Sequence, residues 1–325
     1  MFRAPIRTLR VLAAAVTTVV VTVPFASSAP AVTLHGGDVV VLAREYTTTP
    51  GVLLHLTVAT GVIDTIVPDP PLATPRDLVV CTNGVILVAD ATLGLVGIDP
   101  LSGAAGVTAG PAAFGGSGPT ALARAADGDL LLAGPSGVYR VPADQVVPQS
   151  VSGPGLLSSP TGIVDDGAGG MWVTDDNSGY LGGGGIVHVS AGGAQAVMAT
   201  SCASHSFPIL PLQIRRGPDQ FLYVVNGPYS GPTNYLNAGI FRLDPASGVA
   251  TQWSTTHFIR GFAFATDGSA WVLSGRDISH DPYDGVLARQ GEQVSTGARG
   301  PLALVPDHVT RVRARTWGAL KSLYR

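Results

Sequence analysis

The stretch Pro160–Asp175, PTGIVDDGAGGMWVTD, predicts a β-hairpin. Its two apolar runs, 163–164 and 171–173, flank a turn that ends in Gly169-Gly170. A tight hairpin turn needs positive φ angles, which glycine adopts without strain. The same order recurs along the chain: a Pro or Gly, an apolar stretch, a short turn near Gly, and a second apolar stretch. This hairpin is therefore one copy of a repeat.

The repeat has a period of 42 to 50 residues, because its turns fall at positions 84, 128, 170, 220 and 268. Asn83-Gly84 and Asp127-Gly128 are strong hairpin signals. Two further strands follow in each copy, as in 94–98, which leads into the turn at Asp99-Pro100. A four-stranded unit of this period is the blade of a β-propeller.

The chain ends complete the count of blades. Residues 38–43, 51–58 and 62–67 predict three strands of a unit that lacks its first strand, and residues 300–305 predict a first strand without partners. Joining them closes the ring and removes exposed sheet edges. We therefore predict an all-β, six-bladed β-propeller with four-stranded antiparallel blades, whose last blade is closed by N- and C-terminal strands. Five or seven blades and an open β-solenoid are the alternatives.

The composition agrees with an all-β protein rich in turns. Of 325 residues, 42 are Gly and 25 are Pro, and only 13% are charged. The helix formers Glu and Lys are scarce, which argues against a helical bundle or a coiled coil. The 46% share of hydrophobic residues excludes a disordered chain. A net charge of −3 gives no sign of nucleic-acid binding.

The N-terminus has the order of a secretory signal peptide. Arg3, Arg7 and Arg10 precede an apolar run over 11–23, and small residues follow at 26–31. This run of 13 residues, three of which are Thr, is short for a membrane span, which needs roughly 20. We predict cleavage before Val32 and a secreted or periplasmic location, with no membrane span after cleavage; a retained anchor is the alternative.

The predicted domains are a signal peptide over 1–31, the propeller over 32–307, and a basic, aromatic tail over 308–325. The tail either packs on the outer surface of the propeller or docks a partner. The preference for Arg over Lys, with abundant Ala and Gly, suggests a bacterial source.

The two cysteines are predicted to be free thiols. Cys81 lies near the turn between the first and second strands of one unit, and Cys202 lies in a crossing three units later. In a ring of six units these positions fall on opposite sides, whereas a disulfide requires Cα atoms within about 7 Å.

The copy at Pro160–Asp175 resembles the repeat of NHL, streptogramin-lyase and gluconolactonase-type six-bladed propellers, and the resemblance extends over nearly all of 37–305. In gluconolactonase-type propellers, Asp and Asn residues near the ends of second strands hold a divalent metal above the channel. Carried over, the resemblance implies Asp90, Asp175 and Asn226 as ligands of Ca²⁺ or Mg²⁺. The alternative is that these side chains cap strand ends. The Glu expected at the start of a first strand has no counterpart here.

Streptogramin-lyase-like enzymes use His and Glu with a metal to open a cyclic depsipeptide. The resemblance implies His257 and His280 as acid–base candidates, although the Trp-Phe-Thr-Glu strand ends of that family are absent here. Solvated loop positions are the alternative for both. His55 and His188 alternate with apolar neighbours, which predicts that they face solvent.

In a propeller, the loops between second and third strands (b–c) and the crossings between blades open on one face. Long polar loops on a rigid scaffold favour a binding site. The residues predicted to form this ligand-binding face are Glu45, Arg76, Asp176, Tyr229, Asn237, Arg260 and Asp277.

We predict a monomeric propeller that binds a small molecule or a protein partner on the b–c face. The alternative is a metal-dependent lyase or lactonase acting at the channel mouth, and a third interpretation is a cell-surface interaction module. The sequence leaves open whether the protein is an enzyme.

Overall fold

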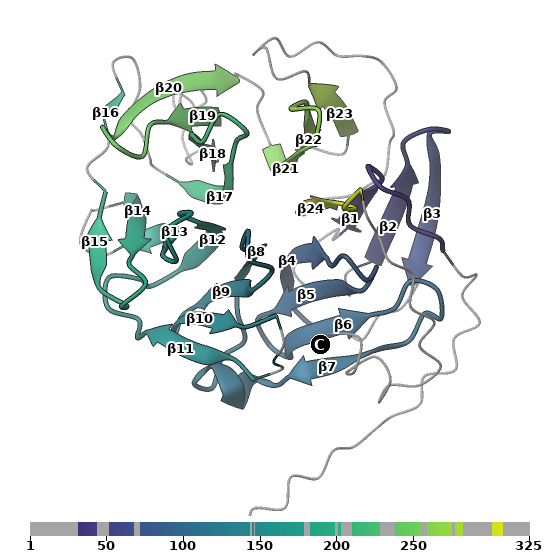
Figure 1. Cartoon of the computed structure of the whole chain (residues 1–325), viewed down its shortest axis with the longest axis horizontal. Helices are drawn as coiled ribbons and strands as arrows, with labels where there is room; N and C mark the ends of the chain where they lie inside the picture. Colours follow the sequence, from purple (N-terminus) through teal and green to yellow (C-terminus); the bar gives the residue numbers. More distant parts are fainter. Residues whose placement is uncertain are drawn as a thin grey trace, which may run out of the picture.

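A computed structural model describes residues 32–43, 52–67, 72–143, 145, 147–178, 183–198, 201–202, 210–227, 238–254, 259–274, 277–281 and 301–307. These residues form strands β1 to β24 and one short 3₁₀ helix, Pro111–Phe114. The strands group into six sheets that stand around a central channel (Figure 1). The predicted all-β propeller with antiparallel four-stranded blades is confirmed.

We number the sheets in chain order and call the strands of each sheet a to d from the channel outward. Sheet 1 has the order β24 (Leu302–Leu304), β1 (Val39–Ala43), β2 (Val52–Thr57) and β3 (Val62–Val67). Sheet 2 has the order β4 (Pro75–Val80), β5 (Ile86–Asp90), β6 (Gly94–Ile98) and β7 (Ala105–Ala109). Sheet 3 has the order β8 (Ala121–Arg124), β9 (Leu130–Gly134), β10 (Gly137–Val141) and β11 (Gln149–Ser152).

Sheet 4 has the order β12 (Pro160–Asp165), β13 (Met171–Ser178), β14 (Gly183–Val189) and β15 (Gln195–Val197). Sheet 5 has the order β17 (Pro211–Arg216), β18 (Leu222–Asn226), β19 (Gly239–Leu243), β20 (Val249–Ser254) and β16 (Ser201–Cys202), the last of which runs parallel to β20. Sheet 6 contains β21 (Ile259–Phe264), β22 (Ala270–Ser274) and β23 (Asp277–Asp281). Five sheets thus have four or more strands, and the described residues of sheet 6 supply three.

The Asn-Gly and Asp-Gly turns between strands a and b have a positive φ angle only at glycine, although the sequence predicted positive φ angles at both turn residues. Gly84, Gly128 and Gly268 adopt φ angles of 83°, 94° and 85° in their turns. In sheet 5 the corresponding residue is Gln220, with φ of 69°, the one non-glycine residue in the described ranges with a positive φ. The repeat therefore keeps its backbone geometry even where the glycine is replaced.

The hydrophobic core lies between neighbouring sheets. The described residues form six buried clusters, and each draws on two consecutive sheets. Leu87 of sheet 2 and Leu132 of sheet 3, for example, belong to the same cluster. Val41 of sheet 1 shares a cluster with Leu273 of sheet 6, so the last sheet also packs on the first. Each sheet is consequently covered on both faces.

The a strands line the channel and contact one another in the order β24, β4, β8, β12, β17 and β21, with β21 again against β24. Sheet 1 is built from both ends of the described chain, because β24 pairs antiparallel with β1 through Leu302 and Val41. Sheets 2 and 5 lie on opposite sides of the channel (Figure 1).

A register shift recurs near the start of strand a in four of the sheets. It falls between Pro75 and Asp77 in sheet 2, Pro160 and Gly162 in sheet 4, Pro211 and Gln213 in sheet 5, and Ile259 and Gly261 in sheet 6. In sheets 2 and 5 the residue after the shift bonds to strand a of the next sheet. Asp77 Oδ2 accepts a hydrogen bond from the Leu122 backbone N–H at 3.0 Å, and Gln213 Oε1 accepts one from Phe262 N–H at 2.9 Å. These side chains therefore tie neighbouring sheets together at the channel.

Sheets 3 and 4 use a threonine one position earlier for the same purpose. Thr120 Oγ1 donates to the Pro160 carbonyl at 2.6 Å, and Thr161 Oγ1 donates to the Pro211 carbonyl. We refer to Asp77, Gln213, Thr120 and Thr161 as the inter-sheet ties.

Two segments predicted as long b–c loops contain strand residues instead. Strand β13 continues to Ser178 through Asp176, and β23 pairs with β22 over Asp277–Asp281. Ser274 pairs with Asp277, a position that the polar composition suggested would lie in a long loop.

The cysteine prediction is confirmed for Cys81, which is a buried free thiol. Burial raises the pKa of this thiol to about 12, although the charge of Arg124 opposes the shift. The side chain of Cys202 lies outside the described residues.

Candidate functional site

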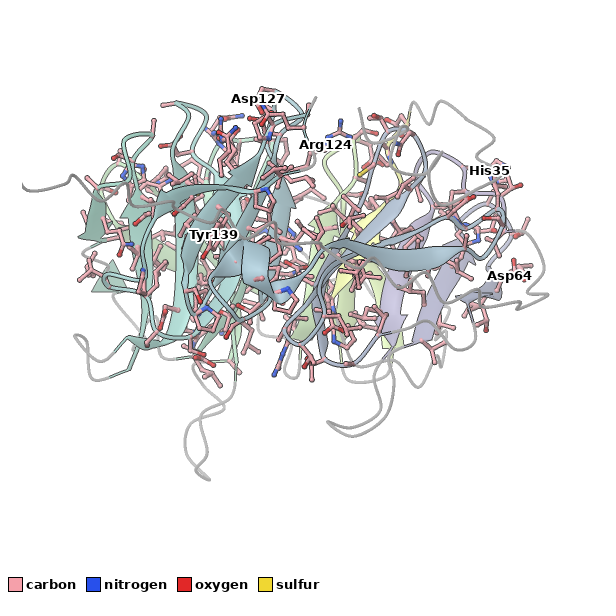
Figure 2. All side chains as sticks on the ribbon, turned by 90° about the horizontal axis from the view of Figure 1, so that it is seen from below. His35, Asp64, Arg124, Asp127 and Tyr139 are labelled. Atoms are coloured by element: carbon pink, nitrogen blue, oxygen red, sulfur yellow. The ribbon has the colours of Figure 1, made fainter. Side chains whose placement is uncertain are left out.

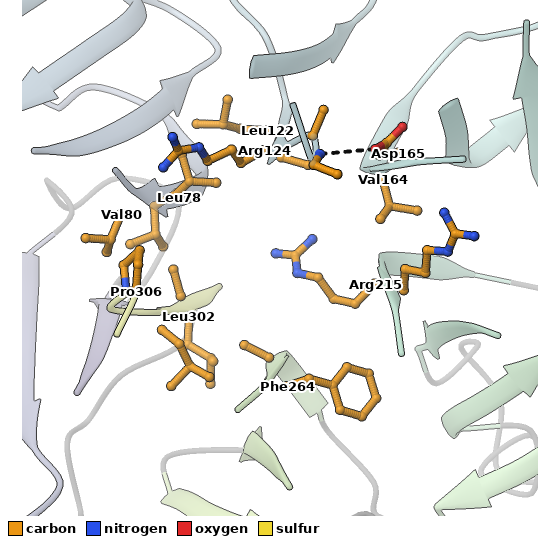
Figure 3. A pocket seen from close by; sticks show the side chains of 18 of the residues that line it. Leu78, Val80, Leu122, Arg124, Val164, Asp165, Arg215, Phe264, Leu302 and Pro306 are labelled. Atoms are coloured by element: carbon orange, nitrogen blue, oxygen red, sulfur yellow. Dashed lines mark hydrogen bonds between the residues drawn. The ribbon is translucent and has the colours of Figure 1, made fainter. Parts of the chain in front are cut away.

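A cavity of about 580 Å³ occupies the channel. It is lined by strand a of every sheet (Figure 3). It also reaches the a–b turns, where Gly167, Gln220 and Pro306 contribute. The cavity therefore lies toward the a–b face, opposite the face that the sequence predicted for ligand binding.

One charged side chain stands in an apolar ring inside this cavity. Arg215 pairs with Tyr223, and the equivalent positions in the other five sheets are Val79, Ala123, Val164, Ala263 and Ala303. All six residues line the cavity. The Arg215 side chain points toward its centre (Figure 3).

The Arg215 guanidinium crosses the channel to a buried carboxylate in sheet 2. Its Nη2 lies 3.3 Å from Asp77 Oδ1, and its Nη1 donates to the Ile214 carbonyl at 3.0 Å. The side chains of Asp77 and Arg215 are 3% and 17% exposed. Burial raises the pKa of Asp77, although Arg215 and two backbone N–H groups act in the opposite direction. The ion pair joins opposite sides of the ring, and its Arg215 member lines the cavity.

The rim adds further charge. Arg124, Arg216 and Asp165 line the cavity near the a–b turns. Asp165 accepts backbone hydrogen bonds from Gly167 at 3.0 Å and Ala126 at 3.2 Å. Within the described ranges, neither Arg124 nor Arg216 forms a salt bridge. Three arginines against two aspartates leave an excess positive charge, which attracts anions into a low-dielectric cavity.

Figure 2 shows the ring from its edge, with Arg124 and the turn residue Asp127 on the same face. Gln220 reaches the cavity from an a–b turn on that face, and its backbone is in the left-handed region that favours glycine. Non-glycine residues held in such conformations cluster at functional sites. Sheet 5 thus supplies Arg215, Arg216 and Gln220 to one end of the channel.

The three predicted metal ligands are engaged within their own sheets. Asp90 is fully buried, and its Oδ2 accepts from the N–H groups of Ala73 and Thr74 at 2.8 and 2.9 Å. Its Oδ1 accepts from Thr92 and Leu93, both at 2.9 Å. A carboxylate offers about four lone-pair positions. Since backbone N–H groups occupy them, Asp90 fits a strand cap rather than a metal ligand.

Asp175 and Asn226 occupy the same place in sheets 4 and 5. Asp175 Oδ2 accepts from the N–H groups of Ser158 at 2.7 Å and Ser159 at 2.9 Å. Asn226 Oδ1 accepts from Leu210 N–H at 3.0 Å. The described part of the chain contains no group of three or more His, Cys, Asp or Glu side chains that could hold a metal ion. The predicted Ca²⁺ or Mg²⁺ stays a prediction.

The other predicted site residues are only partly described. Arg76 is exposed on β4, and Asp176 is half-buried on β13. The backbones of Arg260, Asp277 and His280 lie in strands β21 and β23, where His280 pairs with Trp271. The predicted residues that lie outside the described ranges are Glu45, Tyr229, Asn237 and His257.

None of the described helical residues form a segment long and apolar enough to cross a membrane.

Sequence reasoning missed the cavity because it looked for chemistry at the b–c face. The available signals were Arg215, at a position that is apolar in the other a strands, and Gln220, at a turn position that is glycine in the other hairpins of the repeat.

No protein-family model and no curated protein sequence matches the chain. Solved structures do match it. A chain in the crystal structure of a nidogen/laminin complex is 14% identical, with a TM-score of 0.63 over 83% of this chain and 99% of that chain. The gluconolactonase XC5397 from Xanthomonas campestris is 16% identical, with a TM-score of 0.54 over 84% and 91%. Virginiamycin B lyase from Staphylococcus aureus is 16% identical, with a TM-score of 0.50 over 70% and 73%.

Sequence identities this low, together with the structural match, show a shared fold but not a shared activity. The resemblance of the repeat to streptogramin-lyase and gluconolactonase-type proteins is thereby confirmed at the level of architecture, and the chain has the β-propeller fold found in these structures.

Proposed function

We propose that this protein is an exported β-propeller that binds a small carboxylate ligand in its channel from the a–b face. The observation that carries the proposal is the Arg215 guanidinium, which stands in a ring of otherwise apolar residues inside a cavity of about 580 Å³. Ligand pockets are typically apolar hollows with a few convergent polar groups. A guanidinium matches the two oxygens of a carboxylate in its plane.

The rim supports the same ligand. Arg124 and Arg216 lie at the mouth without an ion-pair partner among the described residues, so an entering anion meets net positive charge. The apolar ring around Arg215 suits a short hydrocarbon body attached to the acid. A small organic acid combines both features.

Export rests on the sequence of residues 1–31, which we propose is removed as a signal peptide. The buried position of Val32 supports this boundary, since its N–H donates to the Pro100 carbonyl at 3.0 Å and its side chain joins the first core cluster. The propeller thus begins directly after the proposed cleavage site. Location in the periplasm or outside the cell follows.

The carboxylate proposal is tested by titration calorimetry with sodium acetate, succinate and citrate at constant ionic strength, with neutral succinamide as the control. We expect at least one of the acids to bind at one molecule per chain, and succinamide to give no heat. Arg216→Gln should weaken that binding about fivefold, because a partly exposed ion pair contributes up to about 1 kcal/mol.

Arg76→Gln is the matched control, because Arg76 is exposed near the opposite end of an a strand and was predicted to form the b–c face. Its binding constant should equal that of the wild type. Weaker binding in Arg76→Gln but not in Arg216→Gln would move the ligand to the b–c face. No heat with any of the three acids would reject the proposal.

We also propose that the six sheets are the six blades of one ring closed by the two chain ends. The pairing of β24 with β1 and the core cluster shared by sheets 6 and 1 support this closure. Deleting residues 301–325 should abolish cooperative melting and lower solubility, because it exposes an edge of β1 and apolar surface. Deleting only 313–325 should change the melting temperature little. Equal melting curves for the two truncations would reject the closure.

A further inference from the structure

The Arg215 side chain divides the channel cavity into two unlike halves. It extends from sheet 5 toward Asp77 in sheet 2, on the opposite side of the channel. Because the a strands contact one another in ring order, sheets 6 and 1 lie along one flank of Arg215, and sheets 3 and 4 lie along the other. Figure 3 shows Phe264 and Leu302 on the first flank, and Arg124 and Asp165 on the second.

The flank formed by sheets 6 and 1 is apolar throughout. The residues that it contributes to the cavity are Ala263, Phe264, Leu302, Ala303, Leu304 and Pro306. Phe264 and Leu304 are half-buried and lie level with Arg216 at the rim. The Phe264 ring is fixed by T-shaped contacts with the rings of Tyr223 and Phe262, at centroid distances of 4.8 and 5.7 Å. This flank is therefore a preformed hydrocarbon surface.

The flank formed by sheets 3 and 4 carries charge at the same level. Arg124 and Asp165 occupy the positions that match Phe264 and Leu304 in the register of the a strands. Arg216 of sheet 5 leans toward this flank, because its guanidinium lies against Gly167 of sheet 4, where a side chain would collide with it. The cavity thus has charged groups on one flank of Arg215 and hydrocarbon on the other. A ligand that matches both is amphipathic.

We infer that the ligand is a monocarboxylic acid with a hydrocarbon tail, whose carboxylate binds Arg215 and whose tail lies against Phe264 and Leu304. This inference rests on the proposed function. Arg215 lines the cavity and its side chain is 17% exposed, so a ligand in the cavity reaches it directly. A guanidinium has five N–H donors, and the bonds to Asp77 and Ile214 use two of them. A second carboxylate buried against the apolar flank would lose its hydration without gaining a partner, which disfavours dicarboxylic and tricarboxylic acids.

The first test varies the ligand and leaves the protein unchanged. Titration calorimetry at constant ionic strength compares acetate, butanoate and hexanoate. Each added CH₂ group should tighten binding about fourfold, the usual gain when such a group is buried. Succinate has the four carbons of butanoate but ends in a second carboxylate. It should bind at least tenfold more weakly than butanoate.

The second test removes hydrocarbon from the apolar flank. Leu304→Asn places a polar amide there, and we expect hexanoate to bind about tenfold more weakly. Acetate should bind as it does to the wild type, because it has no tail to reach this position. Val107→Asn is the matched control, because Val107 is an apolar strand residue that is 40% exposed on β7, the outermost strand of sheet 2. It should leave both constants unchanged. Melting temperatures identify any loss of folding.

The outcomes separate this inference from the proposed function. If the wild type binds no acid of the first panel, both fail. If it binds an acid and Arg216→Gln weakens that binding, but affinity does not rise from acetate to hexanoate, only the amphipathic ligand is rejected. Tighter binding of succinate than of butanoate rejects it as well. Affinity that rises with chain length, with a loss in Leu304→Asn that is confined to hexanoate, supports it. If Leu304→Asn does not fold, the alkanoate series in the wild type decides.

Discussion

Replacing Arg215 with methionine is expected to lower the free energy of unfolding by about 3–5 kcal/mol, the usual loss when one partner of a buried ion pair is removed. The reason is Asp77, whose side chain is 3% exposed. In the variant this buried carboxylate has no cationic partner among the described residues. Two backbone N–H groups, of Leu78 and Leu122, would remain to stabilise its charge. Urea denaturation of the full chain measures the loss.

A second substitution in the same chain should restore much of this stability. Asp77→Asn removes the charge but keeps an oxygen that can accept from Leu122 N–H. Arg215→Met with Asp77→Asn should therefore be more stable than Arg215→Met alone. Arg140→Met is the control. Arg140 pairs with Asp127, which is 55% exposed, and with Asp129, which is 16% exposed, and ion pairs open to solvent contribute up to about 1 kcal/mol.

The pH dependence of the Arg215→Met loss has a definite sign. Burial raises the pKa of Asp77 in the folded state, so protonation of Asp77 favours folding, and this contribution is lost as pH rises through the folded pKa. Without Arg215 that pKa rises further. The stability difference between wild type and variant should therefore be small near pH 4 and larger at about pH 8. A difference that is constant with pH and unaffected by Asp77→Asn would contradict the role assigned to this pair.

Replacing Asp90 with alanine should lower the free energy of unfolding by a similar amount, because it removes a hydrogen-bond acceptor rather than an ion pair. Four backbone N–H groups, of Ala73, Thr74, Thr92 and Leu93, would lose their acceptor at the end of β5. Each buried donor left unpaired costs roughly 1–3 kcal/mol, so even partial rescue by water leaves an expected loss above about 3 kcal/mol. Asp90→Asn should recover only part of it, because its amide nitrogen cannot accept. Denaturation in urea again provides the measurement.

The same variant distinguishes a strand cap from a metal ligand. For a cap, the loss in Asp90→Ala is identical in calcium, in magnesium and in a chelator. For a ligand, the wild type is stabilised by the cation by mass action and the variant is not. Asp176→Ala, at a half-buried position on β13, serves as a control that should change stability little in all three solutions. A calcium-dependent difference confined to Asp90→Ala would revive the metal-dependent lyase or lactonase.

Much of the fold can be predicted from short-range signals in the sequence. The predictions that were wrong have a common cause. The turns at Gly84, Gly128 and Gly268 have the expected positive φ angle at glycine, because the last residue of these short loops adopts the left-handed conformation. His55 illustrates the failure: its alternation with leucines predicted exposure, yet it is 1% exposed, and its Nε2 lies 2.8 Å from Asp38 Oδ2. A blade is covered on both faces by its neighbours, so alternation does not identify a solvent side.

Less of the candidate site than of the fold could be predicted from the sequence. Asp77 and Arg215 are 138 positions apart, and only the arrangement of the sheets around the channel brings them together. Asp90 was correctly placed at the end of a second strand, but its chemistry depends on the direction of nearby N–H groups, which composition does not encode. The resemblance supplied a metal site by position, whereas the geometry around Asp90 decides what that position does.

The inter-sheet ties have a consequence for how the chain acquires its structure. Each tie joins a sheet to the next one along the chain: Asp77 with Leu122, Thr120 with Pro160, and Gln213 with Phe262. Such a molecule can assemble in order during synthesis, each new sheet docking on its predecessor. Some contacts between distant parts of the chain cannot form in this way, among them the Asp77–Arg215 pair and the pairing of β1 with β24. Because contacts distant in sequence form slowly, sealing of the ring should be the last and rate-limiting event in folding, and until then the edge of β1 is open to other chains.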